Sequence, residues 1–288
     1  MRIVAKGLNY TYSAKTKFAV RALKDVDLTV EEGEFFAIVG HTGSGKSTFV
    51  QHLNGLIRVE KNCGSLTVGD YDLTDKKCNF KELRSKVGMV FQYPEYQLFA
   101  ETVAEDVAFG LKNFYKLSPK ETENAVKEAL ETVGLPYEIY REKSPFELSG
   151  GQKRRVAIAG VIVTKPEILV LDEPVAGLDP QGKEEFFALL HALHRSFVKT
   201  VVIISHDMDD VAEHASRVAV FDHGSVFRVA TPRELFSENA EDLVRLGLDL
   251  PVTGWLKQDL SHAGIAIDTD FTVADFAEKV VGLYGGSK

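Results

Sequence analysis

The residues with the clearest chemical role form one glycine-rich stretch, Gly40-His41-Thr42-Gly43-Ser44-Gly45-Lys46-Ser47-Thr48. It satisfies the spacing G-x-x-x-x-G-K-[ST], in which a glycine-rich backbone turns its N–H groups around the phosphates of a nucleotide. Lys46 is expected to reach the outer phosphates, and the Ser47 hydroxyl is expected to hold Mg²⁺. The stretch therefore predicts binding of a nucleoside triphosphate with Mg²⁺, but it does not indicate what the energy drives.

Two carboxylates follow a second apolar segment, residues 168–171, which has the pattern of a buried parallel strand. A strand end downstream of a phosphate loop is a suitable place for a Mg²⁺ ligand, which predicts that role for Asp172. Glu173 can polarise a water molecule for attack on the γ-phosphate and is the predicted general base. A simple turn into solvent is the alternative, and the upstream phosphate loop disfavours it.

A histidine follows the next apolar strand. His206 comes directly after residues 200–205, where it could sense or stabilise the γ-phosphate.

Asp210 and His214 have the i, i+4 spacing of a metal site on a helix. Because no third ligand lies in register, an exposed helix face is the favoured interpretation of that pair.

A second helix start with bare N–H groups is predicted at Ser149-Gly150-Gly151-Gln152. Ser149 is expected to cap this helix, which gives another anion site by the same physics as the phosphate loop. An ordinary Ser N-cap with basic residues on a solvated face is the alternative.

Tyr12 is a possible platform for a nucleotide base, and a core aromatic on a strand is an equally good interpretation.

The order of apolar segments predicts an α/β fold. Residues 1–40 alternate apolar and polar positions and predict antiparallel strands, while residues 63–90 predict strands and turns. Residues 101–165 have a helical pattern. Short helices are expected at 232–236, 241–248, 252–263 and 272–283, the chain ends in Gly285-Gly286-Ser287-Lys288, and 222–224 predicts a hairpin turn.

An aromatic and polar segment, residues 93–99, follows the apolar strand at 87–91. Pro94 stops regular structure there. A loop that exposes several aromatic side chains is typical of a docking site. A loop folded over the core is the alternative.

Composition limits the remaining possibilities. The 288 residues carry a net charge of −8, which argues against a broad nucleic-acid-binding surface. Cys63 and Cys78 show no metal or redox pairing and are expected to be free thiols in a reducing compartment. No signal peptide is recognisable, and the longest apolar run near a helix is far shorter than the roughly 20 residues that span a bilayer. Any membrane role is therefore expected to come through a partner.

Taken together, these motifs resemble the ATP-binding subunits of ABC transporters over residues 1 to about 230. Residues 40–48 match the Walker A loop, 148–152 the LSGGQ signature and 168–173 Walker B. Gln92 matches the Q-loop glutamine, residues 177–179 the D-loop that contains Asp179, and His206 the switch histidine. Tyr12 lies where the adenine-stacking aromatic of the family falls. Val175 departs from the usual Thr or Ser and leaves Asp172 and Glu173 intact.

A finer resemblance is to energy-coupling factor (ECF) transporters, which import vitamins or, in related systems, cobalt or nickel ions. Residues 91–99, 105–110 and 144–152 are similar to that group, as is a C-terminal helical extension of this size. The chain looks most like the second of two paired ATPase subunits. This implies a P-loop core at 1–230 with an antiparallel β-subdomain and a helical subdomain at about 93–165. It is followed by a helical extension at 231–288, whose expected role is dimer contact, with simple packing as the alternative.

The resemblance implies the cofactors, partners and site roles. ATP and Mg²⁺ would bind the loop, with Ser47, Gln92 and Asp172 near the metal and Lys46, Glu173 and His206 in catalysis. A second ATPase subunit would cover the nucleotide with its LSGGQ segment, in a heterodimer or a homodimer. A membrane coupling subunit and a substrate-binding membrane subunit would complete a complex at the cytoplasmic face of the cell membrane, without nucleic acid.

Two other functions are compatible with an ABC-type ATPase. One is action on DNA or ribosomes, which the lack of a sustained heptad run and the presence of a single cassette disfavour. The other is a degenerate cassette that binds ATP only as a structural element. Glu173, His206 and the complete LSGGQ segment argue against it.

Overall fold

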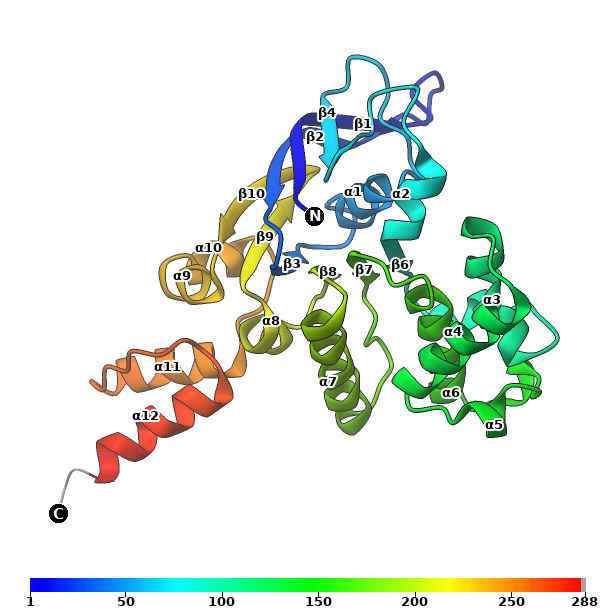
Figure 1. The fold of residues 1–288 in the computed structure, drawn as a ribbon. Coiled ribbons are helices and arrows are strands. Elements are labelled where there is room, and N and C mark those ends of the chain that lie inside the picture. The colour runs from blue at the N-terminus through cyan, green and yellow to red at the C-terminus, as the bar shows by residue number, and fades with distance from the viewer. Residues whose placement is uncertain (286–288) are drawn as a thin grey trace.

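The computed structural model describes residues 1–285, which form two β-sheets and several groups of helices (Figure 1). The strands are β1 Ile3–Tyr12, β2 Val20–Val30, β3 Phe35–Val39, β4 Ser65–Val68, β5 Tyr71–Asp72, β6 Val87–Val90, β7 Ile168–Asp172, β8 Thr200–Ile204, β9 Arg217–Asp222 and β10 Ser225–Ala230. The helices are α1 Lys46–Leu53, α2 Phe80–Lys86, α3 Val103–Phe114, α4 Pro119–Thr132, α5 Tyr137–Tyr140, α6 Gly150–Ile162, α7 Pro180–Ser196, α8 Met208–His214, α9 Pro232–Glu238, α10 Ala240–Arg245, α11 Val252–His262 and α12 Val273–Gly285, with short 3₁₀ helices η1 Pro94–Gln97 and η2 Pro145–Glu147.

The first sheet is antiparallel, with the strand order β2-β1-β4-β5. Leu23, Val26, Leu28 and Val30 of β2 are buried, as the alternating pattern predicts, whereas Val20 at the start of the strand is exposed. The prediction of only strands and turns over 63–90 is wrong at α2. There the Asn79 side chain accepts a hydrogen bond from the N–H of Glu82 and caps the helix, while Phe80 and Leu83 turn inward from one face.

The second sheet has the order β10-β9-β3-β8-β7-β6 and positions the chemistry. Its strands are parallel except β10, which pairs antiparallel with β9. The predicted hairpin turn joins these two, with φ of 45° at His223 and 89° at Gly224. Because the carboxyl ends of parallel strands meet at one edge, the loops after β3, β6, β7 and β8 converge there.

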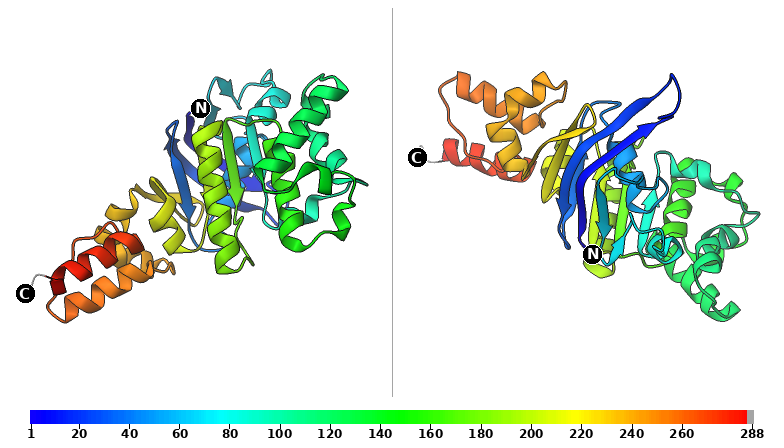
Figure 2. Two further views of the ribbon diagram at one scale, coloured as in Figure 1. Left: turned by 60° about the horizontal axis from the view of Figure 1, so that its bottom comes forward. Right: turned by 90° about the horizontal axis from the view of Figure 1, so that it is seen from above.

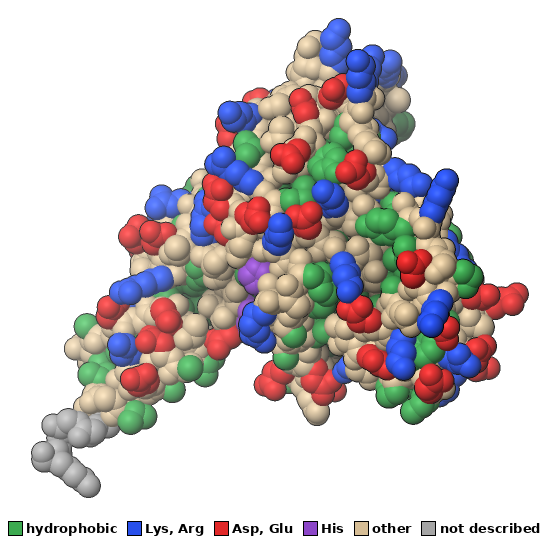
Figure 3. Space-filling view, in the orientation of Figure 1, with side chains coloured by type: hydrophobic (Ala, Val, Ile, Leu, Met, Phe, Trp, Pro, Cys, Tyr) green, Lys and Arg blue, Asp and Glu red, His purple; other side chains and the backbone are tan. Residues whose placement is uncertain are grey.

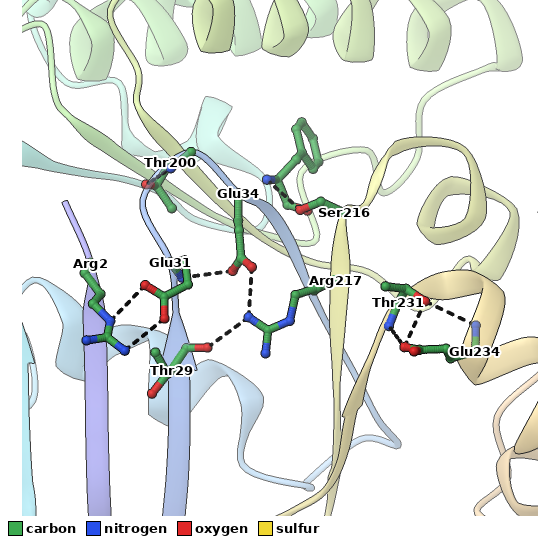
Figure 4. A network of polar contacts seen from close by, with 11 residues as sticks. Arg2, Thr29, Glu31, Glu34, Thr200, Ser216, Arg217, Thr231 and Glu234 are labelled. Carbon is green, nitrogen blue, oxygen red and sulfur yellow. Dashed lines mark hydrogen bonds and ion pairs between the residues drawn. The ribbon is translucent and has the colours of Figure 1, made fainter.

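A buried core lies on each face of this sheet. One core fills the space toward the antiparallel sheet, α1 and α2, and the other lies toward α3, α4, α6, α7 and α8. A polar network also joins the two sheets at their edge (Figure 4). In it, Arg217 at the start of β9 donates to Glu34 at 2.8 Å, and Glu34 accepts from the N–H of Glu31 at 2.9 Å.

The segment between β6 and β7 is helical, and so is the segment after β10, as the sequence predicts. Helices α11 and α12 lie apart from both sheets (Figures 1 and 2). They are joined by a hydrogen bond from the Thr253 hydroxyl to the Phe271 carbonyl oxygen at 2.7 Å. Residues 286–288, which end the predicted extension, lie outside the described residues. None of the helices within residues 1–285 combines the length and the apolar character needed to cross a membrane.

Candidate nucleotide-binding site

The glycine-rich stretch forms the loop between β3 and α1, and two of its glycines are sterically required. Gly40 has φ of 151°, and a Cβ there would collide with the carbonyl oxygen of Phe221. Gly45 has φ of 103°, and a Cβ there would lie 2.5 Å from the carbonyl oxygen of Ala22. The loop therefore keeps its shape only with glycine at both positions.

Lys46 and the loop backbone form a donor-rich surface. Lys46 Nζ donates to the carbonyl oxygens of Gly40 at 2.6 Å and His41 at 3.0 Å. Burial lowers the pKa of the Lys46 ammonium, while the charges of Glu173 and Asp172 oppose that shift. Among residues 1–285, the N–H groups of Gly43, Gly45 and Lys46 have no acceptor, and the buried Ser44 hydroxyl has no partner. This set of donors fits the oxygens of a phosphate chain.

Asp172 and Ser47 lie side by side at the edge of the sheet. Burial raises the pKa of Asp172, whereas a hydrogen bond with Ser47 and the charge of Lys46 lower it. A hydroxyl and a carboxylate oxygen are ligands that Mg²⁺ prefers. The pair therefore fits the predicted metal position.

Glu173 follows Asp172 and meets two residues from other strand ends. Gln92 Nε2, after β6, donates to Glu173 Oε2 at 3.0 Å. His206 Nδ1, after β8, lies 3.7 Å from the same oxygen. The backbone of Glu173 has φ of 46°, an uncommon conformation for a residue with a side chain. Two predicted site residues, Gln92 and His206, thus converge on the carboxylate of a third, Glu173, beside the loop.

Tyr12 lies at the wall of a cavity rather than in the core. Its side chain is 39% exposed, and its hydroxyl is 3.2 Å from Thr48 Oγ1. The cavity has a volume of about 340 Å³ and also touches the loop. Its lining includes Val20, Arg21 and Ala22, which the sequence did not single out. The interpretation of Tyr12 as a core aromatic is therefore wrong, while base stacking on it stays a prediction.

The second predicted anion site lies elsewhere in the fold. Ser149 caps α6 and exchanges hydrogen bonds with Gln152, and the surfaces of Gly150 and Gly151 are open. Asp179 caps α7 by accepting from the N–H of Gly182 at 2.7 Å. Both helix starts border one cavity of about 420 Å³. Figure 1 shows α6 in the helical segment, away from α1 and the phosphate loop.

Sequence reasoning missed a buried arginine beside the second site. Arg154 in α6 contacts both carboxylate oxygens of Glu95 at 3.3 Å and donates to the carbonyl oxygens of Pro174 and Ala176 at 3.1 Å. It thereby links η1 to the loop after Glu173. The run of basic residues that contains Arg154 is visible in the sequence, but its partner Glu95 is 59 residues away. In the same loop, Val175 packs against the core, which accommodates an apolar side chain.

Asp210 and His214 do not form a metal site in the structure. Asp210 Oδ1 pairs with Lys183 Nζ at 2.7 Å, while His214 stacks on Phe187 and faces His191 at 3.1 Å. The expectation that this pair lies on an exposed helix face is wrong as well, since Asp210 is buried. Both side chains point inward because α8 packs against α7.

The aromatic segment after Gln92 is exposed, as predicted for a docking loop. Tyr96 is 84% exposed and Phe99 is 59% exposed, whereas Pro94 and Leu98 are buried and anchor the segment. Phe99 makes an edge-to-face contact with Phe109 of α3. The exposed rings therefore stand on a fixed support.

The phosphate loop, the acids at the end of β7 and the separate glycine-containing helix start define a P-loop ATP-binding cassette. The sequence matches the family described as ABC transporter over residues 23–176. An energy-coupling factor transporter ATP-binding protein, EcfA2, of Clostridioides difficile strain 630 is 48% identical, and the alignment covers 98% of this chain and 96% of that protein. The EcfA2 protein of Symbiobacterium thermophilum is 47% identical, with 100% and 98% covered.

Solved structures agree with this assignment. A structure of cbiO1 from Clostridium perfringens, described as part of the ABC transporter complex cbiONQ, is 37% identical, with a TM-score of 0.73 over 89% of this chain and 98% of that chain. The ATP-binding cassette MJ0796, a dimer in a post-hydrolysis state bound to ADP and Pi, is 31% identical, with a TM-score of 0.70 over 80% and 98%. The chain belongs to the ATP-binding subunits of ABC transporters, in the energy-coupling factor group.

Proposed function

We propose that this chain is an ATP-hydrolysing subunit of an energy-coupling factor importer, which drives uptake of a vitamin, a similar micronutrient or a transition-metal ion through membrane partners. The observation that carries the proposal is the convergence of Gln92, Glu173 and His206 beside the phosphate loop. The names of its relatives support transport over action on DNA or ribosomes.

Each residue of the site has a role in hydrolysis. Lys46 and the free N–H groups of the loop stabilise negative charge on the phosphates. Glu173 accepts the proton of the attacking water, and Gln92 and His206 hold its carboxylate in place and contact the γ-phosphate side. Ser47 and Asp172, with Gln92 nearby, would hold Mg²⁺. That ion, when bound, neutralises phosphate oxygens and orients them.

The second helix start serves a different nucleotide. Ser149 and Gln152 cap the helix through each other, Gly150 and Gly151 present an open surface beside them, and Asp179 borders the same cavity as Gly151. Since these groups lie apart from the chain's own loop, a second ATPase subunit is needed to complete each site. The dimeric form of the related cassette MJ0796 supports this arrangement. A partner ATPase gives a heterodimer, and a second copy gives a homodimer.

The exposed aromatic segment is the proposed contact between the nucleotide site and a membrane coupling subunit. Gln92 contacts Glu173, and the aromatic side chains of residues 93–99 begin directly after it. If a membrane coupling subunit binds these rings, a shift of Gln92 on ATP binding or cleavage would displace it through the adjoining segment. The proposal therefore includes a peripheral location of the chain at the cytoplasmic face of the cell membrane.

Glu173→Gln tests the assignment of the general base. The change preserves shape but removes proton acceptance, so turnover should fall by roughly 10²–10⁴-fold while ATP binding persists. The assay measures phosphate release and retained nucleotide in the assembled complex. Tyr71→Phe, a change on the antiparallel sheet away from the loop, serves as the control. Hydrolysis at the normal rate by Glu173→Gln would refute the role.

Tyr96→Ala tests the docking of a membrane subunit. Removing the most exposed ring of the segment should reduce co-purification with integral membrane proteins by about tenfold or more, because aromatic anchors dominate such contacts. Phe18→Ala is a matched control, since Phe18 is 83% exposed at the turn between β1 and β2. Recovery of the unaltered chain without any membrane protein, from cells that contain its partners, would refute the transport proposal.

A further inference from the structure

Three side chains of metal-binding type meet beside the phosphate loop without a role in hydrolysis. They are His41 in the loop and the adjacent Asp222 and His223 in the β9–β10 turn. His41 Nε2 lies 3.1 Å and His223 Nε2 lies 3.8 Å from Asp222 Oδ1. One ligand atom from each residue falls within 4.8 Å of the others.

The two nitrogens of the His41 ring both face oxygen acceptors. Nδ1 lies 2.9 Å from the Thr42 carbonyl oxygen and Nε2 lies 3.1 Å from Asp222 Oδ1. A neutral imidazole has only one N–H, so it cannot donate to both oxygens. If Nδ1 donates to the carbonyl, the Nε2 lone pair faces the carboxylate lone pairs, and a cation between them removes that repulsion. A backbone carbonyl partner on the second nitrogen is typical of histidines that bind metals.

The two loops that supply these ligands are fastened to each other. The N–H of Gly224 donates to the carbonyl oxygen of Ser44 at 3.0 Å, and the N–H of Lys24 donates to the carbonyl oxygen of Gly224 at 2.8 Å. The turn therefore keeps a fixed position against the phosphate loop. The side chain of His223 is 77% exposed, which leaves an open path for an ion from solvent.

We infer that His41, Asp222 and His223 form a binding site for a divalent transition-metal ion of the Zn²⁺ class. Two imidazoles and a carboxylate suit such an ion, and tetrahedral ligands at about 2.0 Å lie roughly 3.3 Å apart. The observed spacing reaches that arrangement by rotation of the exposed His223 ring. A bound ion ties the phosphate loop to the β9–β10 turn and adds positive charge next to the loop. The site is distinct from Ser47 and Asp172, whose oxygen ligands suit Mg²⁺.

The test is a metal titration of the full-length, chelator-treated protein without nucleotide. Co²⁺ is the probe, its visible absorption reports nitrogen ligation, and Zn²⁺ competition gives the affinity. The intact chain should bind one such ion, and His223→Asn should weaken binding by roughly tenfold to 100-fold. Asn accepts the left-handed backbone at this position, so the turn is preserved. His262→Asn, on exposed α11, is the control and should bind as the intact chain does.

Two results would overturn the inference. One is equal Co²⁺ affinity in His223→Asn, in His206→Asn and in the intact chain, which would leave His41 and Asp222 as a simple hydrogen-bonded pair. The other is an unchanged affinity in His223→Asn with a loss in His206→Asn, which would place the ion beside Glu173. Thermal unfolding without metal shows that each variant is folded. Because binding is measured without ATP, failure here is separable from failure of the proposed ATPase function.

Discussion

Glu173 shows how a single residue depends on three strand ends. Its carboxylate accepts a hydrogen bond from Gln92, which is 81 residues away in sequence, and faces His206. The positive φ at Glu173 turns its side chain away from the line of β7, so that Asp172 and Glu173 serve different partners. The spacing of the motifs predicts which residues take part, and the order of the parallel strands explains why they meet.

His214 provides a residue-scale prediction about pH. Burial, together with the charges of the neighbouring His191 and Lys183, lowers the pKa of His214 to about 4. Between about pH 6.5 and pH 4 the unfolded chain is protonated at this position and the folded chain is not. The free energy of unfolding therefore falls as the pH falls. The loss is at most roughly 3 kcal/mol. His214→Gln should remove this part of the pH dependence in chemical unfolding measured from pH 7 to pH 4.

The neighbouring Asp210 acts in the opposite direction and must be measured with it. Burial raises the pKa of Asp210 to about 6, although its pairing with Lys183 lowers it. As the pH falls from 6 toward 3.8, the folded chain takes this proton first, so stability rises. Asp210→Asn should therefore steepen the decline at low pH, whereas His214→Gln should flatten it. The same slope in both variants would contradict these assignments.

At the scale of elements, α6 connects the helical segment to the catalytic edge. Its N-terminus carries the second anion site, and Arg154 one turn later is bound by Glu95 of η1 and by two carbonyl groups after Glu173. The α6 helix thus contacts both η1, within the exposed aromatic segment, and the loop that follows Glu173, the proposed general base.

Arg154→Ala tests this connection. The change leaves Glu95 and the carbonyl oxygens of Pro174 and Ala176 without their buried partner, so the free energy of unfolding should fall by about 3–5 kcal/mol in urea denaturation. Arg155→Ala is a control on the same helix. Arg155 pairs with exposed Glu185 at 2.6 Å, and loss of such a pair costs about 0–1 kcal/mol. Equal losses in both variants would refute a special role for Arg154.

The sequence predicts the longer elements well and the short ones less well. The C-terminal helices, the hairpin turn and the antiparallel strands follow from periodicity and turn residues. The α2 helix was missed because, unlike the equally short α9, it has no proline in its first turn to mark its start. The Arg154 contacts and the cluster at His41 and Asp222 were missed because their partners are brought together only by the folded sheet.

At the scale of the whole molecule, the proposed mechanism assigns to the described chain two half-sites that face different nucleotides. One half includes the phosphate loop, Asp172, Glu173 and Tyr12, and the other includes the start of α6 and Asp179. Charged side chains of both signs are spread over the face in Figure 3. In that mechanism neither half encloses a nucleotide alone, so assembly with a second ATPase subunit is part of the proposal.

Ser149→Arg tests that division of labour. Ser149 is exposed at the start of α6, and a long cationic side chain there should block approach of a nucleotide held by another subunit without touching the chain's own loop. In a Glu173→Gln background, ATP should still bind, but ATP-driven association with a second ATPase subunit should be lost in analytical ultracentrifugation. Ser118→Arg is the matched control, because Ser118 caps α4 with the same type of capping box. Both variants lose a cap worth about 1 kcal/mol, so a difference in association reports the interface and not helix stability. Association of Ser149→Arg at the level of Ser118→Arg would mean that α6 does not cover the partner's nucleotide.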